Sequence, residues 1–265
     1  MKLSLNDRAQ YLRAPSIRQF SNRMKDIEDC VNLTIGQPDF NMPQVVKDAY
    51  INAINEDMTS YSHNKGLIET RRAVSHYFYH KYNFQYSEEE IIITNGASEA
   101  IEQHITAKTK AILLNYPTNP TGVTLTFNEV EALVTTLQQH ELFIISDEIY
   151  AENTFNGTHT SFAQFDSIRD QLLLIGGLSK SHSATGIRIG FLIGPEYLIE
   201  KLTFMHAYNC ICANVPAQVA CIAALNEGLE APQYMNEAYI ERKNYLVQKL
   251  ESLGFELDAQ PEGAF

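Results

Sequence analysis

The middle of the chain alternates between short apolar runs and longer stretches with a helical period. Apolar runs of four or five residues predict strands at 91–94, 111–115, 142–146, 172–175 and 189–193. Several of these runs are apolar at consecutive positions, as expected for strands that helices cover on both faces of a largely parallel sheet. Helical patterns, such as the one at 128–140, lie between the runs. We therefore expect an α/β fold built on a mainly parallel sheet flanked by helices.

The last third of the chain is more helical. Between 233 and 253, apolar and aromatic residues recur close to every 3.6 positions, at Tyr239, Ile240, Leu246, Leu250 and Leu253. This pattern predicts a helix that ends before Gly254. Residues 255–257 (FEL) then predict the start of a further strand.

Composition and charge limit the kinds of partner. The 265 residues are 45% hydrophobic and 20% charged, which suits a globular chain with a substantial core. The formal net charge of −12 at pH 7 argues against binding to nucleic-acid phosphates. No apolar run is long enough to predict a membrane span, and the string MKLSLNDRAQ lacks the apolar centre of a signal peptide. We expect a cytoplasmic protein with no nucleic-acid or membrane partner.

The cysteine spacing gives no sign of a metal site or of disulfides. Cys30, Cys210, Cys212 and Cys221 form no C-x-x-C pair and have no histidine at zinc-binding spacing. We expect reduced thiols, as is usual in cytoplasmic proteins, and no bound metal.

Four polar segments rich in small residues adjoin the predicted strands. They are NGASEA (95–100), NYPTNPTG (115–122), SDEIY (146–150) and GGLSKSHSATGIRIG (176–190). In an open α/β sheet, ligands bind at the edge formed by the carboxyl ends of the strands. The position of these segments therefore predicts one shared ligand site.

Two basic residues stand out in the last of these segments. Lys180 follows an apolar strand in a loop of small residues, where partial desolvation lowers the pKa of an amine and makes it a nucleophile. The alternative is a solvated loop lysine. Arg188 lies between Gly186 and Gly190, where its planar guanidinium suits a phosphate group. Its alternative is a surface ion pair.

Asp147 closes an apolar strand. A carboxylate buried there is costly unless it pairs with a cation, and a protonated ring nitrogen of a cofactor would be such a partner. A metal or a structural network is the alternative. The string SDE also resembles the acidic end of a Walker B strand, but the chain has neither G-x-x-x-x-G-K-[ST] nor G-x-G-x-x-G. NGASEA stands at an expected helix start, where backbone N–H groups are available to an anion.

Together these residues describe a ligand with an aldehyde, a pyridinium ring and a phosphate. The four segments resemble those of the fold-type I, pyridoxal-5′-phosphate-dependent class I/II aminotransferases. SKSHSATGIRIG is similar to the lysine signature of that family, and NPTG and SDEIY match in the same order. The strings NYPTNPTG, GLSKSHSATGIRIG and HAYNCICANV are most similar to those of bacterial aromatic and N-acetyl-diaminopimelate aminotransferases. The likeness covers nearly the whole chain from about Asn32 onward.

The resemblance implies a role for each residue of the site. Lys180 would form an imine with the cofactor and later move a proton between the substrate Cα and the cofactor. Asp147 would keep the pyridine nitrogen protonated, and Tyr150 and Asn119 would hydrogen-bond the ring hydroxyl. The other implied contacts are Arg188, Ser179, Gly96, Ala97 and Ser98 at the phosphate, Ile149 on one ring face, Tyr61 at the phosphate of a neighbouring subunit, and Gly36 with Asn119 near the substrate.

The resemblance also implies an activity. A homodimer would transfer an amino group between an amino acid and a 2-oxo acid by a ping-pong mechanism. Two alternatives stay open. The same cofactor serves β-lyases and decarboxylases, and a chain that kept the pocket without full activity would be a remnant or a regulatory binding module.

Three features depart from the family's pattern. Gly177 stands three residues before Lys180, where many members have a serine that binds the phosphate. Residues 95–109 join two predicted strands, whereas the family carries two more strands and a stacking aromatic ring there, so we expect a deletion near 100–101. The family also continues beyond PEGAF (261–265) with a small domain that supplies the arginine for the substrate carboxylate, and no residue here is assigned that role.

We expect three regions along the chain. An N-terminal segment (1–35) would join the small domain, a cofactor-binding large domain would span 36–250, and 251–265 would begin a truncated C-terminal small domain.

The shortened crossover must pass three strands, about 19 Å at ~4.8 Å per spacing. As a helix, its fifteen residues reach about 22 Å, so the five strands should stay contiguous.

Overall fold

The computed structural model describes residues 27–29, 36–96, 111–257 and 259–264. The chain divides into two compact units, Met1–Pro38 and Asp39–Phe265. Every helix and strand described below belongs to the second unit. The expected N-terminal region, 1–35, falls mostly outside the described residues, and the three-region division stays a prediction.

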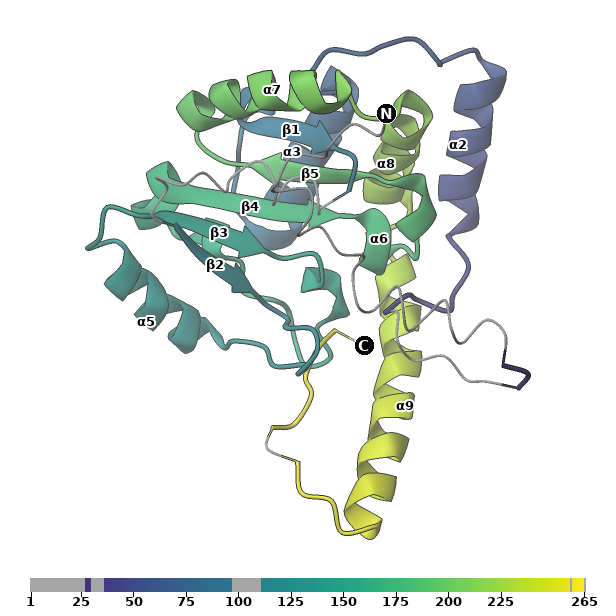
Figure 1. The fold of residues 1–265 in the computed structure, drawn as a ribbon, viewed down its shortest axis with the longest axis vertical. Coiled ribbons are helices and arrows are strands. Elements are labelled where there is room, and N and C mark those ends of the chain that lie inside the picture. The colour runs from purple at the N-terminus through teal and green to yellow at the C-terminus, as the bar shows by residue number, and fades with distance from the viewer. Residues whose placement is uncertain (1–26, 30–35, 97–110, 258, 265) are drawn as a thin grey trace, which may run out of the picture. The chain divides into compact units, whose positions relative to one another are not determined.

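Five strands form one sheet in the described part of the chain (Figure 1). Their spatial order is β1-β5-β4-β3-β2. The strands are β1 (Ile91–Thr94), β2 (Ala111–Asn115), β3 (Phe143–Asp147), β4 (Leu172–Gly177) and β5 (Gly190–Ile193). All five lie where the sequence predicts them, within one or two residues, and they are contiguous as expected. Three strands lie between β1 and β2 in the sheet, which is the number predicted.

The sheet is parallel except at β5. Strands β2, β3 and β4 pair in parallel, whereas β5 is antiparallel to both β4 and β1. The chain leaves β4 at Gly177 and returns into β5 at Gly190, and these two residues lie opposite each other in the ladder. A connection that returns at the same sheet edge makes neighbouring strands antiparallel, because a parallel pair needs a crossover.

Helices account for most of the remaining elements. The α-helices are α2 (Gln44–Asn55), α3 (Ile68–Tyr82), α5 (Phe127–Leu137), α6 (Leu178–Ser181), α7 (Glu196–Cys210), α8 (Val215–Glu227) and α9 (Ala231–Ser252). Short 3₁₀ helices are η2 (Glu88–Glu90), η3 (Ala151–Asn153), η4 (Phe162–Gln164), η5 (Asp166–Gln171) and η6 (Thr185–Ile187). The expected helix at 128–140 is α5. It begins at a capping box in which Thr126 and Glu129 bond each other's backbone amides.

The expected helix at 233–253 is α9, but the strand expected at 255–257 is wrong. Gly254 adopts a positive φ of 86° and ends the helix. The Phe255 amide then donates to the Leu250 carbonyl at 3.1 Å. This C-terminal cap consumes the amide that a strand would need for its ladder.

Helices cover both faces of the sheet, as the apolar strands predict. On one face, Ile92, Leu173 and Leu192 pack with Ile199 and Leu202 of α7. The other face packs against α3, α5 and α8 in a larger core.

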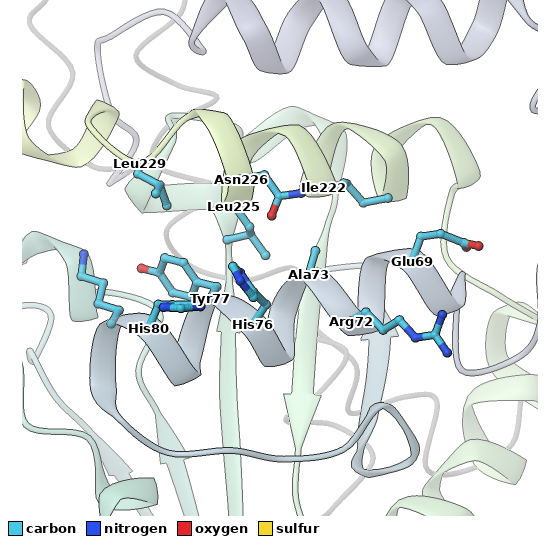
Figure 2. Close-up of a pocket in the computed structure, with 11 residues that line it drawn as sticks. Glu69, Arg72, Ala73, His76, Tyr77, His80, Ile222, Leu225, Asn226 and Leu229 are labelled. Carbon is cyan, nitrogen blue, oxygen red and sulfur yellow. The ribbon is translucent and has the colours of Figure 1, made fainter.

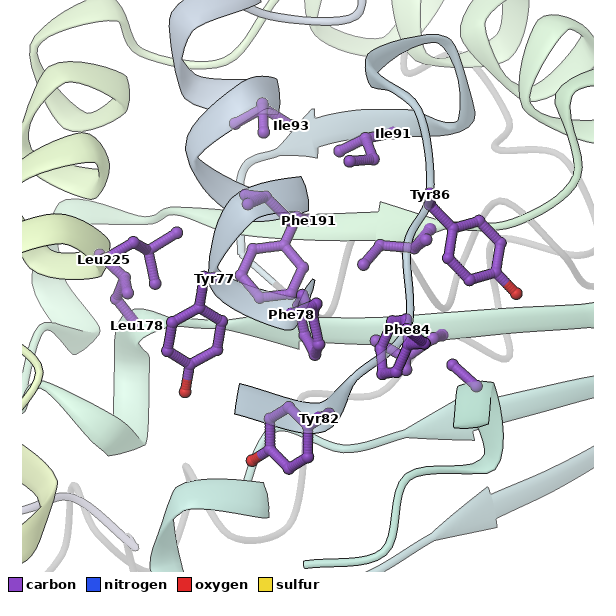
Figure 3. Close-up of a cluster of buried hydrophobic side chains, with 14 of the residues drawn as sticks. Tyr77, Phe78, Tyr82, Phe84, Tyr86, Ile91, Ile93, Leu178, Phe191 and Leu225 are labelled. Atoms are coloured by element: carbon purple, nitrogen blue, oxygen red, sulfur yellow. The ribbon is translucent and has the colours of Figure 1, made fainter. Parts of the chain in front are cut away.

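Aromatic rings form the centre of this larger core (Figure 3). Phe78 of α3 lies with its ring centroid 5.0 Å from Phe84, 5.7 Å from Tyr82 and 5.6 Å from Phe191 of β5. Such offset and edge-on contacts add to the stabilisation from burial. The cluster thus fixes α3 on the strands that lead to the site.

Among the described helices, none is long and apolar enough to cross a membrane. In the described part of the chain, Cys210, Cys212 and Cys221 form no disulfide, and Cys30 lies outside it.

Candidate active site

The ends of β2, β3 and β4 bring the predicted site residues to one edge of the sheet. Asn115 ends β2, Asp147 ends β3, and Lys180 lies in α6, which begins directly after β4. In the register of the sheet, Asn115 pairs with Asp147 and Asp147 pairs with Ile175. The parallel strands therefore bring segments that are far apart in sequence to a single edge.

Asp147 is a buried carboxyl group held by the turn that follows it. Its Oδ1 accepts a hydrogen bond from the Ile149 amide at 3.2 Å, and the Asn115 side chain donates to its backbone carbonyl at 3.1 Å. Burial raises the pKa of Asp147 to about 6. Within the described ranges, no lysine, arginine or histidine forms an ion pair with it.

Lys180 lies close to the aromatic ring of Tyr150. Its Nζ is 5.5 Å from the ring centroid. Burial, followed by the nearby charge of Arg188, lowers the pKa of the Lys180 amine. Burial also raises the pKa of Tyr150, and the charge of Asp147 adds to this shift. Tyr150 thus lies near both functional groups: its ring is close to the Lys180 amine, and its hydroxyl senses the charge of Asp147.

Asn119 contacts the same tyrosine from the loop after β2. Its Nδ2 donates to the Tyr150 hydroxyl at 2.8 Å. The loop is held by Thr118, whose Oγ1 donates to the Asn115 carbonyl at 2.6 Å and whose own carbonyl accepts from the Gly122 amide at 2.7 Å. The structure thus brings Asn119, Tyr150 and Lys180 together.

Arg188 reaches across to the turn after β1. It adopts a left-handed backbone with φ 54°, and its guanidinium donates to the carbonyls of Thr185 at 2.9 Å and Asn95 at 3.4 Å. Gly96 has a φ of 86°, and a Cβ added there would lie 2.4 Å from Nη2 of Arg188. Only glycine suits this close approach. A guanidinium has five N–H donors, so donors remain for an anion.

The rest of the expected phosphate site is described only in part. Ser179 is buried in α6 beside Lys180. Ala97 and Ser98 lie outside the described residues.

Gly177, the departure noted in the sequence, pairs with Gly190 where β4 and β5 meet. A Cβ added there would lie 2.9 Å from the Ile189 carbonyl oxygen and 3.0 Å from Gly190 Cα. The Ile149 side chain would be 3.3 Å away. A serine therefore does not fit this backbone without a shift, which gives a physical reason for glycine here.

The structure does not test the expected roles of two further site residues. The side chain of Tyr61 is 79% exposed, so its expected role on a neighbouring subunit stays a prediction. Gly36 belongs to the other compact unit, and its role near the substrate also stays a prediction.

Sequence reasoning assigned no role to Asn115 or Glu148. Asn115 contacts the backbone of Asp147, and Glu148 is buried beneath the same turn. The sequence feature that could have identified both residues is a polar side chain at or just after the end of an apolar strand. No group of three or more metal-binding side chains occurs in the part of the chain that the structure describes.

A separate groove lies between α3 and α8 (Figure 2). Its volume is about 910 Å³, and its lining includes Ala73, His76, His80, Ile222 and Leu225. None of the expected cofactor residues lines it, so we place the chemistry at the sheet edge.

Comparison of the sequence with protein families gives a match over nearly the whole chain. The profile of the family described as "Aminotransferase class I and II" matches residues 28–109 and 98–265. A Bacillus subtilis (strain 168) protein named "Probable N-acetyl-LL-diaminopimelate aminotransferase" is 37% identical over 318 positions, covering 100% of this chain and 80% of that protein. Because that alignment exceeds the 265 residues of the chain, the relative holds residues that this chain lacks within the aligned region.

Solved structures give the same result. The aspartate aminotransferase from Thermus thermophilus with maleate has a TM-score of 0.91 and 25% identity, covering 100% of this chain and 84% of its own. The aspartate aminotransferase from Thermotoga maritima has a TM-score of 0.87 and 26% identity, covering 98% and 84%. The sheet and its helices thus correspond to the large domain of this fold. The chain belongs to the class I and II aminotransferases.

Proposed function

We propose that this chain uses pyridoxal 5′-phosphate to move an amino group from an amino acid to a 2-oxo acid in two half-reactions. The observation that carries the proposal is the meeting of a desolvated lysine and a buried carboxyl group beside Tyr150 at one sheet edge. The names of the relatives support the reaction class.

The residues of the site fit this cofactor. Asp147 is a buried acid that gains a cationic partner if a protonated pyridine nitrogen lies beside it. Gly96 leaves the space that lets the Arg188 guanidinium lie against the turn after β1, where it would hold the phosphate. Ser179 would donate to the phosphate through its hydroxyl, and Ala97 and Ser98 would donate through their backbone amides.

The bound cofactor supplies a conjugated ring that accepts the electron pair left when the substrate Cα loses its proton. With the cofactor bound, Asp147 would hold the proton on the ring nitrogen. Lys180 would serve as the nucleophile toward the aldehyde and as the base at the substrate Cα, and its lowered pKa keeps more of the amine unprotonated at neutral pH. Asn119 orients the Tyr150 hydroxyl by donating to it.

The direct test is amino transfer itself. We would load the protein with pyridoxal phosphate and supply acidic, aromatic or diamino acids, with and without a 2-oxo acid, and measure the products by chromatography. Transfer to the 2-oxo acid, absent in Lys180→Ala, is expected. Ammonia or carbon dioxide released without an acceptor would instead indicate a lyase or decarboxylase. Cofactor binding with no product would indicate a binding module.

We also propose that the active form is a homodimer. Three large apolar residues are exposed to solvent: Tyr61 (79%), Phe204 (56%) and Tyr208 (93%). Their exposure supports an apolar contact with a second copy of the chain. Sedimentation of wild type and Tyr61→Ser tests this. A monomeric wild type at micromolar concentration would contradict it.

A further inference from the structure

Glu148 is buried directly behind the residues that face the proposed cofactor. It follows Asp147 and precedes Ile149 and Tyr150, yet its side chain is only 3% exposed. Its amide donates to the Ile175 carbonyl at 2.9 Å, which extends the pairing of β3 with β4 by one residue. The reaction described above gives this carboxyl group no role.

Both carboxylate oxygens of Glu148 are satisfied by donors from separate segments. Oε1 accepts from the Ser146 hydroxyl at 2.9 Å and from the Phe162 amide at 3.1 Å. Oε2 lies 2.9 Å from Nε2 of His159. An ionised carboxylate can only accept a hydrogen bond, so the imidazole is the donor toward an ionised Glu148. Phe162 is the first residue of η4, so Glu148 also satisfies an amide that the short helix leaves open. Without these donors a buried carboxylate would be costly.

The other titratable groups around this carboxylate are few and identifiable. From the loop before η4 comes His159, whose ring lies edge-on to Tyr82 of α3 at 6.3 Å. Tyr82 itself donates to Glu152 at 2.8 Å. Tyr86 lies under the guanidinium of Arg169 from η5, at 3.8 Å. The charge of Glu148 acts on Tyr82, on Tyr86 and on Asp147.

We propose that Glu148 is a positioning residue for Asp147: its three hydrogen bonds fix the turn 147–150, and its negative charge makes Asp147 a stronger base toward the cofactor's ring nitrogen. The inference rests on the proposed function, since it concerns the same site. The two acids have different tasks. Donors from Ser146, Phe162 and His159 hold the Glu148 carboxylate. Among the described residues, the Ile149 amide holds the Asp147 carboxylate, and Asn115 holds the Asp147 backbone carbonyl.

The electrostatic part of this inference agrees with the ionisation of Asp147. Its pKa is raised to about 6, first by burial and then by the charge of Glu148, while hydrogen bonds from Ile149 and Asn115 act in the opposite direction. A like charge nearby disfavours the ionised form and so favours any state in which Asp147 meets a proton or a cation. Removing the charge of Glu148 should therefore lower the pKa of Asp147.

The test follows the Asp147 carboxyl by ¹³C NMR in protein without cofactor. We would compare wild type with Glu148→Gln, which keeps the side-chain shape, and with His159→Gln, which retains an N–H donor toward Glu148. Glu90→Gln is the matched control, because Glu90 is a partly buried glutamate paired with Arg169 away from the site. We expect a wild-type midpoint of about 6, a lower midpoint in Glu148→Gln, and no decrease in His159→Gln or Glu90→Gln.

An unchanged midpoint in Glu148→Gln, or an equal decrease in Glu90→Gln, would overturn the inference. If Glu148→Gln does not fold, a decrease in His159→Gln would overturn it on its own. In loaded protein, Glu148→Gln should lower kcat with KM unchanged, and the bound cofactor should lose its ring proton at lower pH than in wild type. Because the first titration needs no cofactor, its failure is distinguishable from a failure of the proposed amino transfer.

Discussion

Replacing Asp147 by asparagine should make the protein without cofactor more stable at neutral pH. Asp147 is a buried carboxyl group with no basic partner among the described residues, and the substitution removes its charge while keeping an oxygen for the Ile149 amide. A buried carboxylate that serves to bind a cationic ligand lowers the stability of the folded protein as long as the ligand is absent.

The size of the effect follows from the pKa of Asp147. Its value is 3.8 in ordinary surroundings and about 6 in the folded protein. Because the pKa of Asp147 is raised in the folded state, ionisation of this group costs no stability below about pH 4. The free energy of unfolding then decreases as the pH rises through about 6. At about 1.4 kcal/mol per pKa unit, ionised Asp147 lowers the free energy of unfolding by roughly 1.5 kcal/mol at pH 5 and by about 3 kcal/mol at pH 8.

Urea unfolding at pH 5 and pH 8 measures this difference. The chain has no tryptophan, so circular dichroism is the suitable signal. Asp147→Asn should gain more stability over wild type at pH 8 than at pH 5. Asp170→Asn, at an exposed residue, is the control substitution. A gain that is the same at both pH values, or a less stable variant at pH 8, would refute the reasoning.

Three further substitutions test other parts of the structure. Gly96→Ala should weaken pyridoxal phosphate binding by about tenfold or more, because the strained left-handed backbone and the displacement of Arg188 cost about 1–3 kcal/mol. Equal affinity of variant and wild type in a binding titration would contradict this. Arg188→Gln should move the reaction of Lys180 with an amine reagent to higher pH, since a positive neighbour is lost; an unaltered profile would speak against that coupling. Phe78→Ala should lower the free energy of unfolding by about 3–5 kcal/mol through a cavity among Phe84, Tyr82 and Phe191, and a loss below 1 kcal/mol would show that the core closes around it.

The strands could be predicted because each is a short, nearly continuous apolar run. The direction of β5 could not, since local hydropathy is the same for a strand that runs either way. The direction depends on where the chain re-enters the sheet, at Gly190 opposite Gly177. The strand expected at 255–257 was wrong because a helix cap took the Phe255 amide.

The site was predictable where the residue types carry the chemistry. Lys180, Asp147 and Arg188 stand in segments whose small residues mark strand ends. The approach of Arg188 to Gly96 joins residues far apart in the sequence, and only the antiparallel return of β5 beside β1 brings them together. Glu148 was assigned no role because a glutamate beside an aspartate looks solvent-exposed until its three donors are known.

The central claim is that the Lys180 amine carries pyridoxal phosphate, and covalent trapping tests it most directly. The protein is incubated with the cofactor, reduced with borohydride, digested, and examined by peptide mass spectrometry. We expect one phosphopyridoxyl group on the peptide that contains Lys180, at close to one per chain. Labelling of Lys65 or other lysines with Lys180 unmodified would contradict it.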